Sequence, residues 1–159
     1  MTRPENGGQG RATAGYAGDL SPQDAWDLLR REPNSVLVDC RSQAEWSFVG
    51  VPDLSTLGKR PVLVEWQSFV PNATGGKPRM AANANFARDL EQAGVPKDAS
   101  VVFICRSGGR SRSAAIAMTG SGWGRCYNLA GGFEGPHDGG QHRGSSAGWK
   151  HDGLPWVQE

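Results

Sequence analysis

Apolar residues occur along this chain in short continuous runs separated by segments with helical spacing. Three of these runs, 35–39, 61–66 and 100–104, contain β-branched residues, and the first ends in a charged residue. A shorter fourth run spans 126–129. Short apolar runs without alternation are typical of strands buried on both faces, which occur mainly in parallel sheets. The pattern therefore predicts four buried strands.

Segments before and between these runs favour helices. The first is expected to have Ser21 as its N-cap and Pro22 as its first helical residue, and to end before Pro33. The others are expected over 83–93, where apolar residues recur four apart, and over 111–118, which is rich in alanine. Alternating strands and helices predict an α/β fold, a mostly parallel sheet with helices on both faces.

Composition limits the number of domains and the class of partner. The 159 residues suffice for one domain with its own core, and 23 glycines indicate many turns. The formal net charge of +1 gives no overall field that would attract nucleic acid or an acidic membrane, so we expect neither as a partner. We expect a monomer or a weak homodimer.

The chain ends and its glycine-rich regions give the expected domain limits. Residues 1–17 are polar and lack the apolar core of a secretory signal, and no apolar run is long enough to cross a bilayer. We therefore predict a cytoplasmic protein with a disordered tail over 1–17 and a single domain over 18–157. Residues 134–148, rich in glycine and histidine, are expected to form a loop insertion.

The strongest chemical signal is a cysteine that directly follows a predicted strand. Cys105 comes after the 100–104 run and precedes a short glycine-containing turn and a predicted helix. This order places the sulfur at the carboxyl edge of the sheet, facing the first turn of a helix, where unpaired backbone N–H groups bind anions. A thiolate held in this way is a nucleophile.

The residues after Cys105 have side chains suited to such a site. Gly108 and Gly109 are expected to allow positive φ, and Ser111 is expected to be an N-cap whose hydroxyl reaches the sulfur. Guanidinium groups fit tetrahedral oxyanions. The candidate substrate-binding residues are Arg106, Ser107, Gly108, Gly109, Arg110 and Ser111.

The simpler interpretation of Cys105 is a buried structural thiol, as many lone cysteines are. Two arginines and two glycines within five residues favour a functional cysteine instead. Cys126 lies in an apolar run and is expected to be a core residue. Cys40 follows another predicted strand, so it could be either a packed thiol or a resolving thiol for Cys105.

These motifs together resemble the rhodanese family. Its active-site loop has six residues counted from the cysteine, often with arginine second and glycine fourth, as in 105–110. Residues 36–41 followed by Glu45 and Trp46 resemble the family's strand that ends in Asp-x-Arg. The runs 127–132, 148–150 and 153–155 resemble further family motifs. The resemblance extends over residues 18–157, but where the family often has Gly-His-Ile-Pro-Gly-Ala this chain lacks the histidine.

The resemblance implies a rhodanese-like fold and a single-domain sulfurtransferase with Cys105 as the catalytic residue. Cys105 would carry a sulfane sulfur as a persulfide between a small anionic donor such as thiosulfate and a thiol or cyanide acceptor, without a cofactor or metal. Asp39 and Arg41 are expected to organise the turn after their strand without taking part in the chemistry.

Other functions remain open from the sequence. Phosphatases and arsenate reductases of similar fold have five residues between the cysteine and the arginine of their loop. Only four residues separate Cys105 from Arg110 here, which argues against those activities. A non-catalytic or redox-sensing binding module is the second alternative. His137, His142 and His151 match no metal-binding spacing, and we expect them to be solvated.

Overall fold

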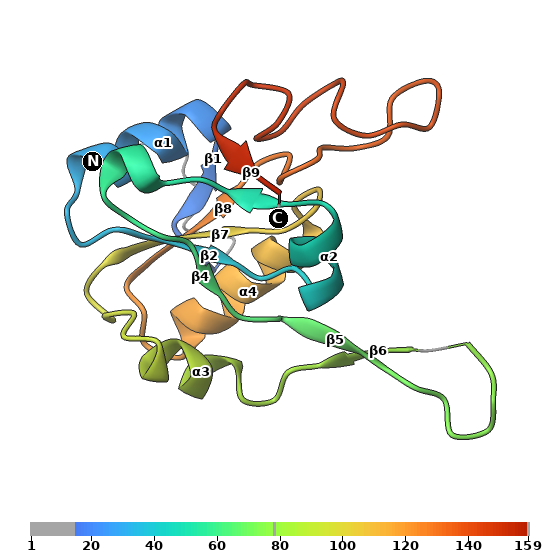
Figure 1. The fold of residues 1–159 in the computed structure, drawn as a ribbon. Helices are drawn as coiled ribbons and strands as arrows, with labels where there is room; N and C mark the ends of the chain where they lie inside the picture. The colour runs from blue at the N-terminus through green and yellow to red at the C-terminus, as the bar shows by residue number, and fades with distance from the viewer. Residues whose placement is uncertain (1–14, 78, 159) are drawn as a thin grey trace.

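The computed structural model describes residues 15–77 and 79–158 and consists of a five-stranded parallel sheet between two layers (Figure 1). The strand order is β1-β8-β7-β2-β4, and every neighbouring pair is parallel. The five strands are β1 (Gly18–Leu20), β2 (Val36–Asp39), β4 (Val62–Leu63), β7 (Ser100–Ile104) and β8 (Arg125–Leu129). The α/β fold with helices on both faces of the sheet is confirmed.

The two faces of the sheet bury separate sets of apolar side chains. Val101 and Phe103 of β7 pack on one face with residues of α3 (Phe86–Gln92) and α4 (Gly109–Gly120). Val102 and Ile104 pack on the other face with α1 (Pro22–Arg31) and residues of the C-terminal segment. Because successive side chains of a strand point to opposite faces, a continuous apolar run is needed where both faces are covered.

Helix α1 begins as the sequence predicts. The Ser21 hydroxyl accepts a hydrogen bond from the backbone N–H of Asp24 at 3.1 Å, and Pro22 is the first helical residue. Helix α4 differs from its prediction, because it begins at Gly109 with Gly108 as N-cap at φ 118°. Ser111 is therefore a residue of the first helical turn and not an N-cap. Gly109 does not have a positive φ.

Several short elements complete the fold. They are the helix α2 (Gln43–Phe48), the 3-10 turn η3 (Ser55–Leu57), the strands β3 (Val51–Pro52) and β9 (Trp156–Val157), which pair antiparallel, and the antiparallel hairpin of β5 (Gln67–Val70) and β6 (Arg79–Ala82). The hairpin extends away from the body of the protein (Figure 1). Its two strands flank residues 71–78, which are rich in glycine and proline.

The ends of the described chain and its long loop lie around this core. Residues 1–14 of the predicted tail lie outside the described residues, while Tyr16 is buried and the N–H of Ala17 donates to the carbonyl of Cys126 at 2.8 Å. Residues 134–148 contain no helix or strand. Within the described part of the chain, none of the helices has the length and apolarity needed to span a membrane.

Candidate active site

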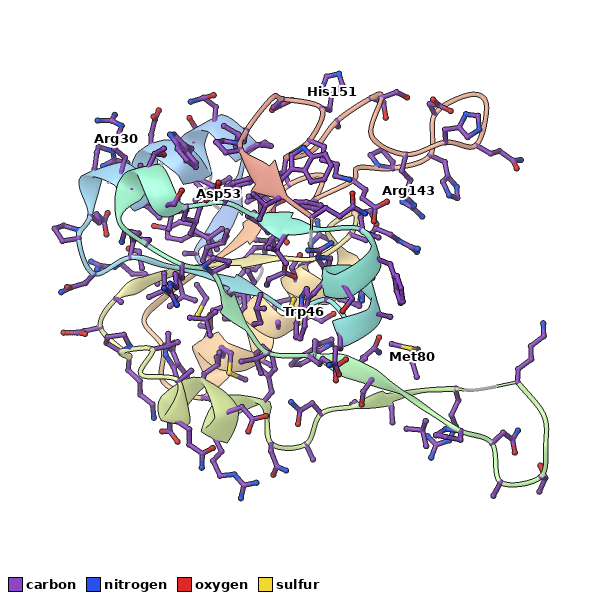
Figure 2. The ribbon with its side chains drawn as sticks, in the orientation of Figure 1. Arg30, Trp46, Asp53, Met80, Arg143 and His151 are labelled. Atoms are coloured by element: carbon purple, nitrogen blue, oxygen red, sulfur yellow. The ribbon has the colours of Figure 1, made fainter. Side chains whose placement is uncertain are left out.

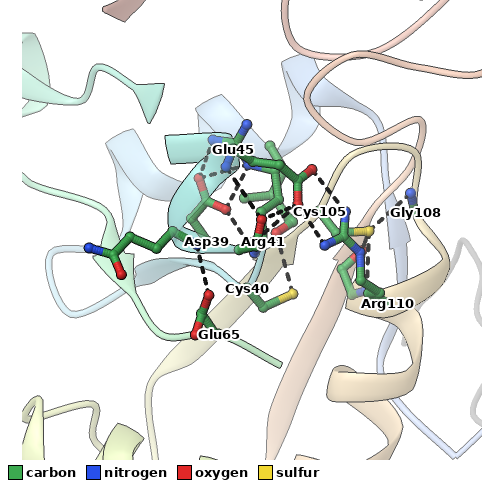
Figure 3. A network of polar contacts seen from close by, with 12 residues as sticks. Asp39, Cys40, Arg41, Glu45, Glu65, Cys105, Gly108 and Arg110 are labelled. Carbon is green, nitrogen blue, oxygen red and sulfur yellow. Dashed lines mark hydrogen bonds and ion pairs between the residues drawn. The ribbon is translucent and has the colours of Figure 1, made fainter. Parts of the chain in front are cut away.

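Cys105 lies at the carboxyl edge of the central sheet, between the end of β7 and the start of α4 (Figure 3). Its side chain is buried. The backbone N–H groups of Gly108 and Ser111 donate to the Cys105 Sγ at 3.2 and 3.3 Å, and the Ser111 Oγ lies 3.2 Å from the same sulfur. Two N–H donors directed at one sulfur stabilise a thiolate there, since hydrogen bonds to a charged acceptor are the stronger ones.

The loop is held in shape by the chain that follows β8. The N–H of Phe133 donates to the carbonyl of Cys105 at 2.8 Å, and the N–H of Glu134 donates to the carbonyl of Arg106 at 2.9 Å. These bonds require a close approach at Gly132, which has φ 64° and where an added Cβ would lie 2.5 Å from the Arg106 carbonyl carbon. Only glycine fits there without displacing the loop.

Arg110 forms a two-pronged ion pair with Glu45 of α2 (Figure 3). Its Nη1 and Nη2 lie 2.8 and 3.0 Å from the two carboxylate oxygens, and both side chains are mostly buried. Burial alone would raise the pKa of Glu45, but hydrogen bonds from Arg110 and Ser42 outweigh burial and lower it to about 2. Hydrogen bonding to Glu45 likewise outweighs burial of Arg110 and raises the pKa of its guanidinium.

Arg110 therefore already has a carboxylate partner, and its charge is largely balanced. Arg106 and Ser107 are exposed, and the described structure records no ion pair for Arg106. Of the two loop arginines, Arg106 is the one whose guanidinium is available to an incoming anion. From the sequence alone, Arg110 would be the expected donor-binding residue because it closes the loop, but its pairing with Glu45 favours Arg106 for that role.

A cavity of about 590 Å³ lies beside the loop. Arg106 and Arg110 line one side of it, and Phe48 of α2 and Met80 of β6 supply apolar surface. In Figure 2, the Met80 side chain lies on the side of the hairpin that faces α2. Sequence reasoning missed Phe48 and Met80, because an exposed phenylalanine and a methionine distant in the chain carry no motif.

A family model described as "Rhodanese-like domain" matches residues 21–137. The chain belongs to the rhodanese-like family.

Several proteins are similar to this chain over most of its length. The crystal structure of Rv0390 from M. tuberculosis is similar with a TM-score of 0.78 and 46% identity, covering 91% of this chain and 99% of that one. An uncharacterized protein of Rickettsia conorii is 34% identical over 83% of this chain and 90% of its own. The thiosulfate sulfurtransferase GlpE of Actinobacillus pleuropneumoniae is 24% identical over 86% and 90%.

Asp39 and Arg41 form a fully buried pair behind the rhodanese-like loop. The Arg41 Nη2 lies 2.7 Å from the Asp39 Oδ2 and also donates to the carbonyl of Gly50 at 2.6 Å. The Arg41 guanidinium stacks over the ring of Phe133, 4.3 Å from its centroid. The pair therefore connects β2 with the segment that supports the Cys105 carbonyl.

The two other thiols of this rhodanese-like domain are also buried. Cys40 is the residue next to Cys105 across the β2–β7 register, and its thiol donates to the carbonyl of Ile104 at 3.4 Å. Burial raises the pKa of Cys40 well above its usual value and raises that of Cys126 to about 11. A buried, protonated thiol is a poor nucleophile, so the environment of Cys40 favours a packing role over a resolving one.

Sequence reasoning missed Asn128 and Asp19, two polar residues that are linked to Cys105 through Ser111. The Ser111 Oγ donates to the Oδ1 of Asn128 on β8 at 2.5 Å, and the Asn128 Nδ2 donates to Asp19 of β1 at 3.1 Å. An asparagine within an apolar strand is the signal that could have indicated Asn128, because buried amides need partners. The histidines predicted to be solvated lie in the C-terminal loops, with His151 2.9 Å from Asp152 (Figure 2).

Proposed function

We propose that this protein is a sulfurtransferase in which Cys105 accepts a sulfane sulfur from a thiosulfate-like donor and passes it to a thiol or to cyanide. The observation that carries the proposal is the convergence of the Gly108 and Ser111 N–H groups on the Cys105 sulfur. Membership of a family with sulfurtransferases among its relatives supports the same conclusion.

The reaction consists of two displacements at sulfur. The Cys105 thiolate attacks the outer sulfur of thiosulfate, a new S–S bond forms, and sulfite leaves with the electrons of the S–S bond that breaks. The negative charge now rests on the outer sulfur of the Cys105 persulfide. Cyanide or a thiolate then attacks that sulfur, and the Cys105 thiolate leaves, so the enzyme returns to its initial state.

The loop stabilises charge in both steps. Preorganised N–H donors compensate the charge on sulfur without reorganising during the reaction, and this is a large contribution in many enzymes. Arg106 faces the cavity and supplies positive charge for the oxyanion end of the donor. Arg110 acts differently, because Glu45 binds both of its Nη groups.

Cys105→Ser is the decisive variant. Intact-mass measurement after incubation with thiosulfate should show a gain of one sulfur atom in the wild-type protein and none in the variant, and thiosulfate:cyanide transfer should be lost. Cys40→Ser, which removes a buried neighbouring thiol, is the matched control and should keep the mass gain. Sulfur transfer by folded Cys105→Ser would refute the proposal, and absence of sulfur loading in the wild-type protein would favour a non-catalytic binding module.

A further inference from the structure

A chain of hydrogen bonds connects the Cys105 sulfur with the far edge of the sheet. It runs from Sγ to the Ser111 hydroxyl at 3.2 Å, then to the Asn128 amide at 2.5 Å, and ends at the Asp19 carboxylate at 3.1 Å. Ser111 and Asn128 are buried, whereas Asp19 is partly exposed on β1. A buried polar chain that ends at the nucleophile needs an explanation beyond packing.

Asp19 determines which way the Asn128 amide faces. The Asp19 Oδ1 accepts hydrogen bonds from the Asn128 Nδ2 and from the Tyr16 hydroxyl, the latter at 2.7 Å. A carboxylate only accepts, so the amide nitrogen must face Asp19, and the amide oxygen must face Ser111. The oxygen in turn can only accept, so the single Ser111 proton is directed toward Asn128.

This orientation decides what the Cys105 sulfur receives. Ser111 has one proton and two possible acceptors, the Asn128 oxygen and the sulfur. We propose that Asn128, oriented by Asp19, is a positioning residue that holds the Ser111 proton away from the Cys105 sulfur. The thiolate is then stabilised by the Gly108 and Ser111 N–H groups without a full hydrogen bond from the Ser111 hydroxyl.

Directing the Ser111 proton toward Asn128 makes the Cys105 sulfur more reactive, and this part of the inference depends on the proposed function. A third donor would stabilise the thiolate further, but a more stable thiolate is a weaker nucleophile and a better leaving group. Withdrawing the Ser111 proton therefore favours attack on the donor. After the persulfide forms, the charge has moved to the outer sulfur, and the Ser111–Asn128 bond fits that state as well.

Other charged and titratable groups near Cys105 belong to different elements. Arg110 of α4 with its partner Glu45 of α2, Arg106 of the loop, and Cys40 after β2 surround it. At the far end of the chain of bonds, Arg112 lies 3.8 Å from Asp19. None of the tests below replaces these groups. The Asp19 variants leave Arg112 without its partner, and comparison of Asp19→Ala with Asp19→Asn separates that change of charge from loss of the oxygen acceptor.

The first test is the pH dependence of Cys105 alkylation by iodoacetamide, measured by peptide mass spectrometry. In Asn128→Leu the freed Ser111 hydroxyl can donate to the sulfur, and the pH midpoint should fall by about one unit. The double variant Asn128→Leu/Ser111→Ala should have the same pH midpoint as Ser111→Ala, because no Ser111 hydroxyl remains to donate to the sulfur. The proposal would be overturned if the midpoint of folded Asn128→Leu equalled or exceeded that of the wild-type protein. It would also be overturned if Asn128→Leu lowered the midpoint equally with and without the Ser111 hydroxyl.

The second test acts from the surface, so it stays informative if Asn128→Leu does not fold. Asp19→Ala removes the acceptor that orients the amide, and the midpoint should fall. Asp19→Asn removes the same charge but keeps an oxygen acceptor, and should stay close to wild type. Equal shifts in the two variants would mean that Asp19 acts through its charge alone, and the proposal would be wrong.

Asp27→Ala is the matched control for Asp19→Ala. The Asp27 side chain is 42% exposed and lies 3.6 Å from Arg30, while that of Asp19 is 41% exposed and lies 3.8 Å from Arg112. Asp27→Ala should leave the pH midpoint of Cys105 alkylation unchanged. Because alkylation does not require sulfur transfer, these results stand even if Cys105 carries no sulfane sulfur.

In the active enzyme, Asn128→Leu should also slow sulfur loading about threefold at high pH and accelerate persulfide discharge.

Discussion

Arg106 and Arg110 carry the same charge in the same loop but have different surroundings. Glu45 binds Arg110 in a mostly buried, two-pronged pair, whereas Arg106 is exposed beside the cavity. A guanidinium that is already paired offers little to an anionic donor. We therefore assign donor attraction to Arg106 and maintenance of the loop to Arg110.

Stopped-flow measurement of the two half-reactions tests this assignment. Arg106→Ala should lower kcat/KM for thiosulfate about five- to tenfold, since one charge-assisted contact of about 1–1.5 kcal/mol is lost. Discharge of a preloaded persulfide by cyanide should change much less. Arg110→Ala should slow both half-reactions, because it leaves Glu45 without its partner and loosens the loop. A selective loss of loading in Arg110→Ala alone would reverse the assignment.

Gly132 controls the loop through backbone contact alone. In Gly132→Ala the new Cβ would lie 2.6 Å from the Cys105 carbonyl oxygen, so the loop must move. We expect activity to fall at least tenfold and the free energy of unfolding to fall by about 2–3 kcal/mol. Both effects are measured on one preparation by steady-state assay and urea unfolding.

Gly58→Ala is the matched control for Gly132→Ala. Gly58 has φ 69°, similar to the 64° of Gly132, but an added Cβ there meets nothing within 4 Å. It should show the conformational cost of about 1 kcal/mol and keep full activity. Similar losses of activity in both variants would show that backbone strain, not contact with the loop, is responsible.

At the scale of elements, α2 is joined to α4 by the Glu45–Arg110 pair. Glu45 also completes the capping box of α2, since the Ser42 Oγ accepts from the Glu45 N–H and the Glu45 carboxylate accepts from the Ser42 N–H. One carboxylate thus caps one helix and binds the side chain of another. The position of α2 relative to α4, beside the cavity, therefore depends on the charge of Glu45.

The ion pair predicts a stability that depends on pH. The pKa of Glu45 is lowered from 4.5 to about 2 in the folded protein, so its contribution is complete above pH 4.5 and is lost as pH falls toward 2. Glu45→Gln keeps the capping box geometry but not the charge. It should lower the free energy of unfolding by about 1–3 kcal/mol at pH 7. The difference from wild type should shrink between pH 4.5 and 2.

Denaturant unfolding at several pH values measures this difference. Glu91→Gln is the control, because Glu91 pairs with Lys97 at 3.4 Å with about half of each side chain exposed. An exposed pair of this kind contributes little, so that variant should differ from wild type by less than about 0.5 kcal/mol at any pH. A Glu45→Gln difference that does not change with pH would contradict the assigned role of the charge.

The sequence predicted the strands that bury continuous apolar runs and missed helix α2 and the hairpin strands, which have no such runs. The strands at 36–39, 100–104 and 125–129 follow from their runs, because both faces of the sheet are covered, whereas only Val62–Leu63 of the predicted strand 61–66 forms a strand. Helix α2 buries none of its residues, so it has no amphipathic pattern, although its capping box was a usable signal. The hairpin strands are Gln-Ser-Phe-Val and Arg-Met-Ala-Ala, which also lack a clear period.

The candidate site shows the same division between local and distant information. The local order of strand, cysteine, glycine turn and helix predicted the convergence of N–H groups on Cys105. The pairing of Glu45 with Arg110 and that of Asn128 with Ser111 could not be derived, because the paired residues lie 65 and 17 positions apart in the chain. Such contacts depend on strand order, which no local pattern specifies.

At the scale of the whole molecule, the hairpin of β5 and β6 stands apart from both cores (Figure 1). None of its residues whose exposure is described is buried, yet Gln67 and Met80 line the cavity beside the loop. A two-stranded hairpin alone is marginally stable in water, so its presence is not explained by stability. Under the proposed sulfurtransferase function, we expect the hairpin to contact acceptors larger than cyanide.

Replacing residues 68–81 with a short Asn-Gly turn tests this division between stability and acceptor binding. The free energy of unfolding should change by less than about 1 kcal/mol, whereas truncating a fully buried core leucine, as in Leu29→Ala, should cost about 2–5 kcal/mol. Thiosulfate:cyanide transfer should remain within about twofold of wild type, since Cys105 and its N–H donors are unchanged. The KM for a bulky thiol acceptor should rise about three- to tenfold, because apolar contact worth about 0.7–1.4 kcal/mol is removed. Equal changes with cyanide and with the bulky thiol would show that the hairpin supports the loop and does not contact the acceptor.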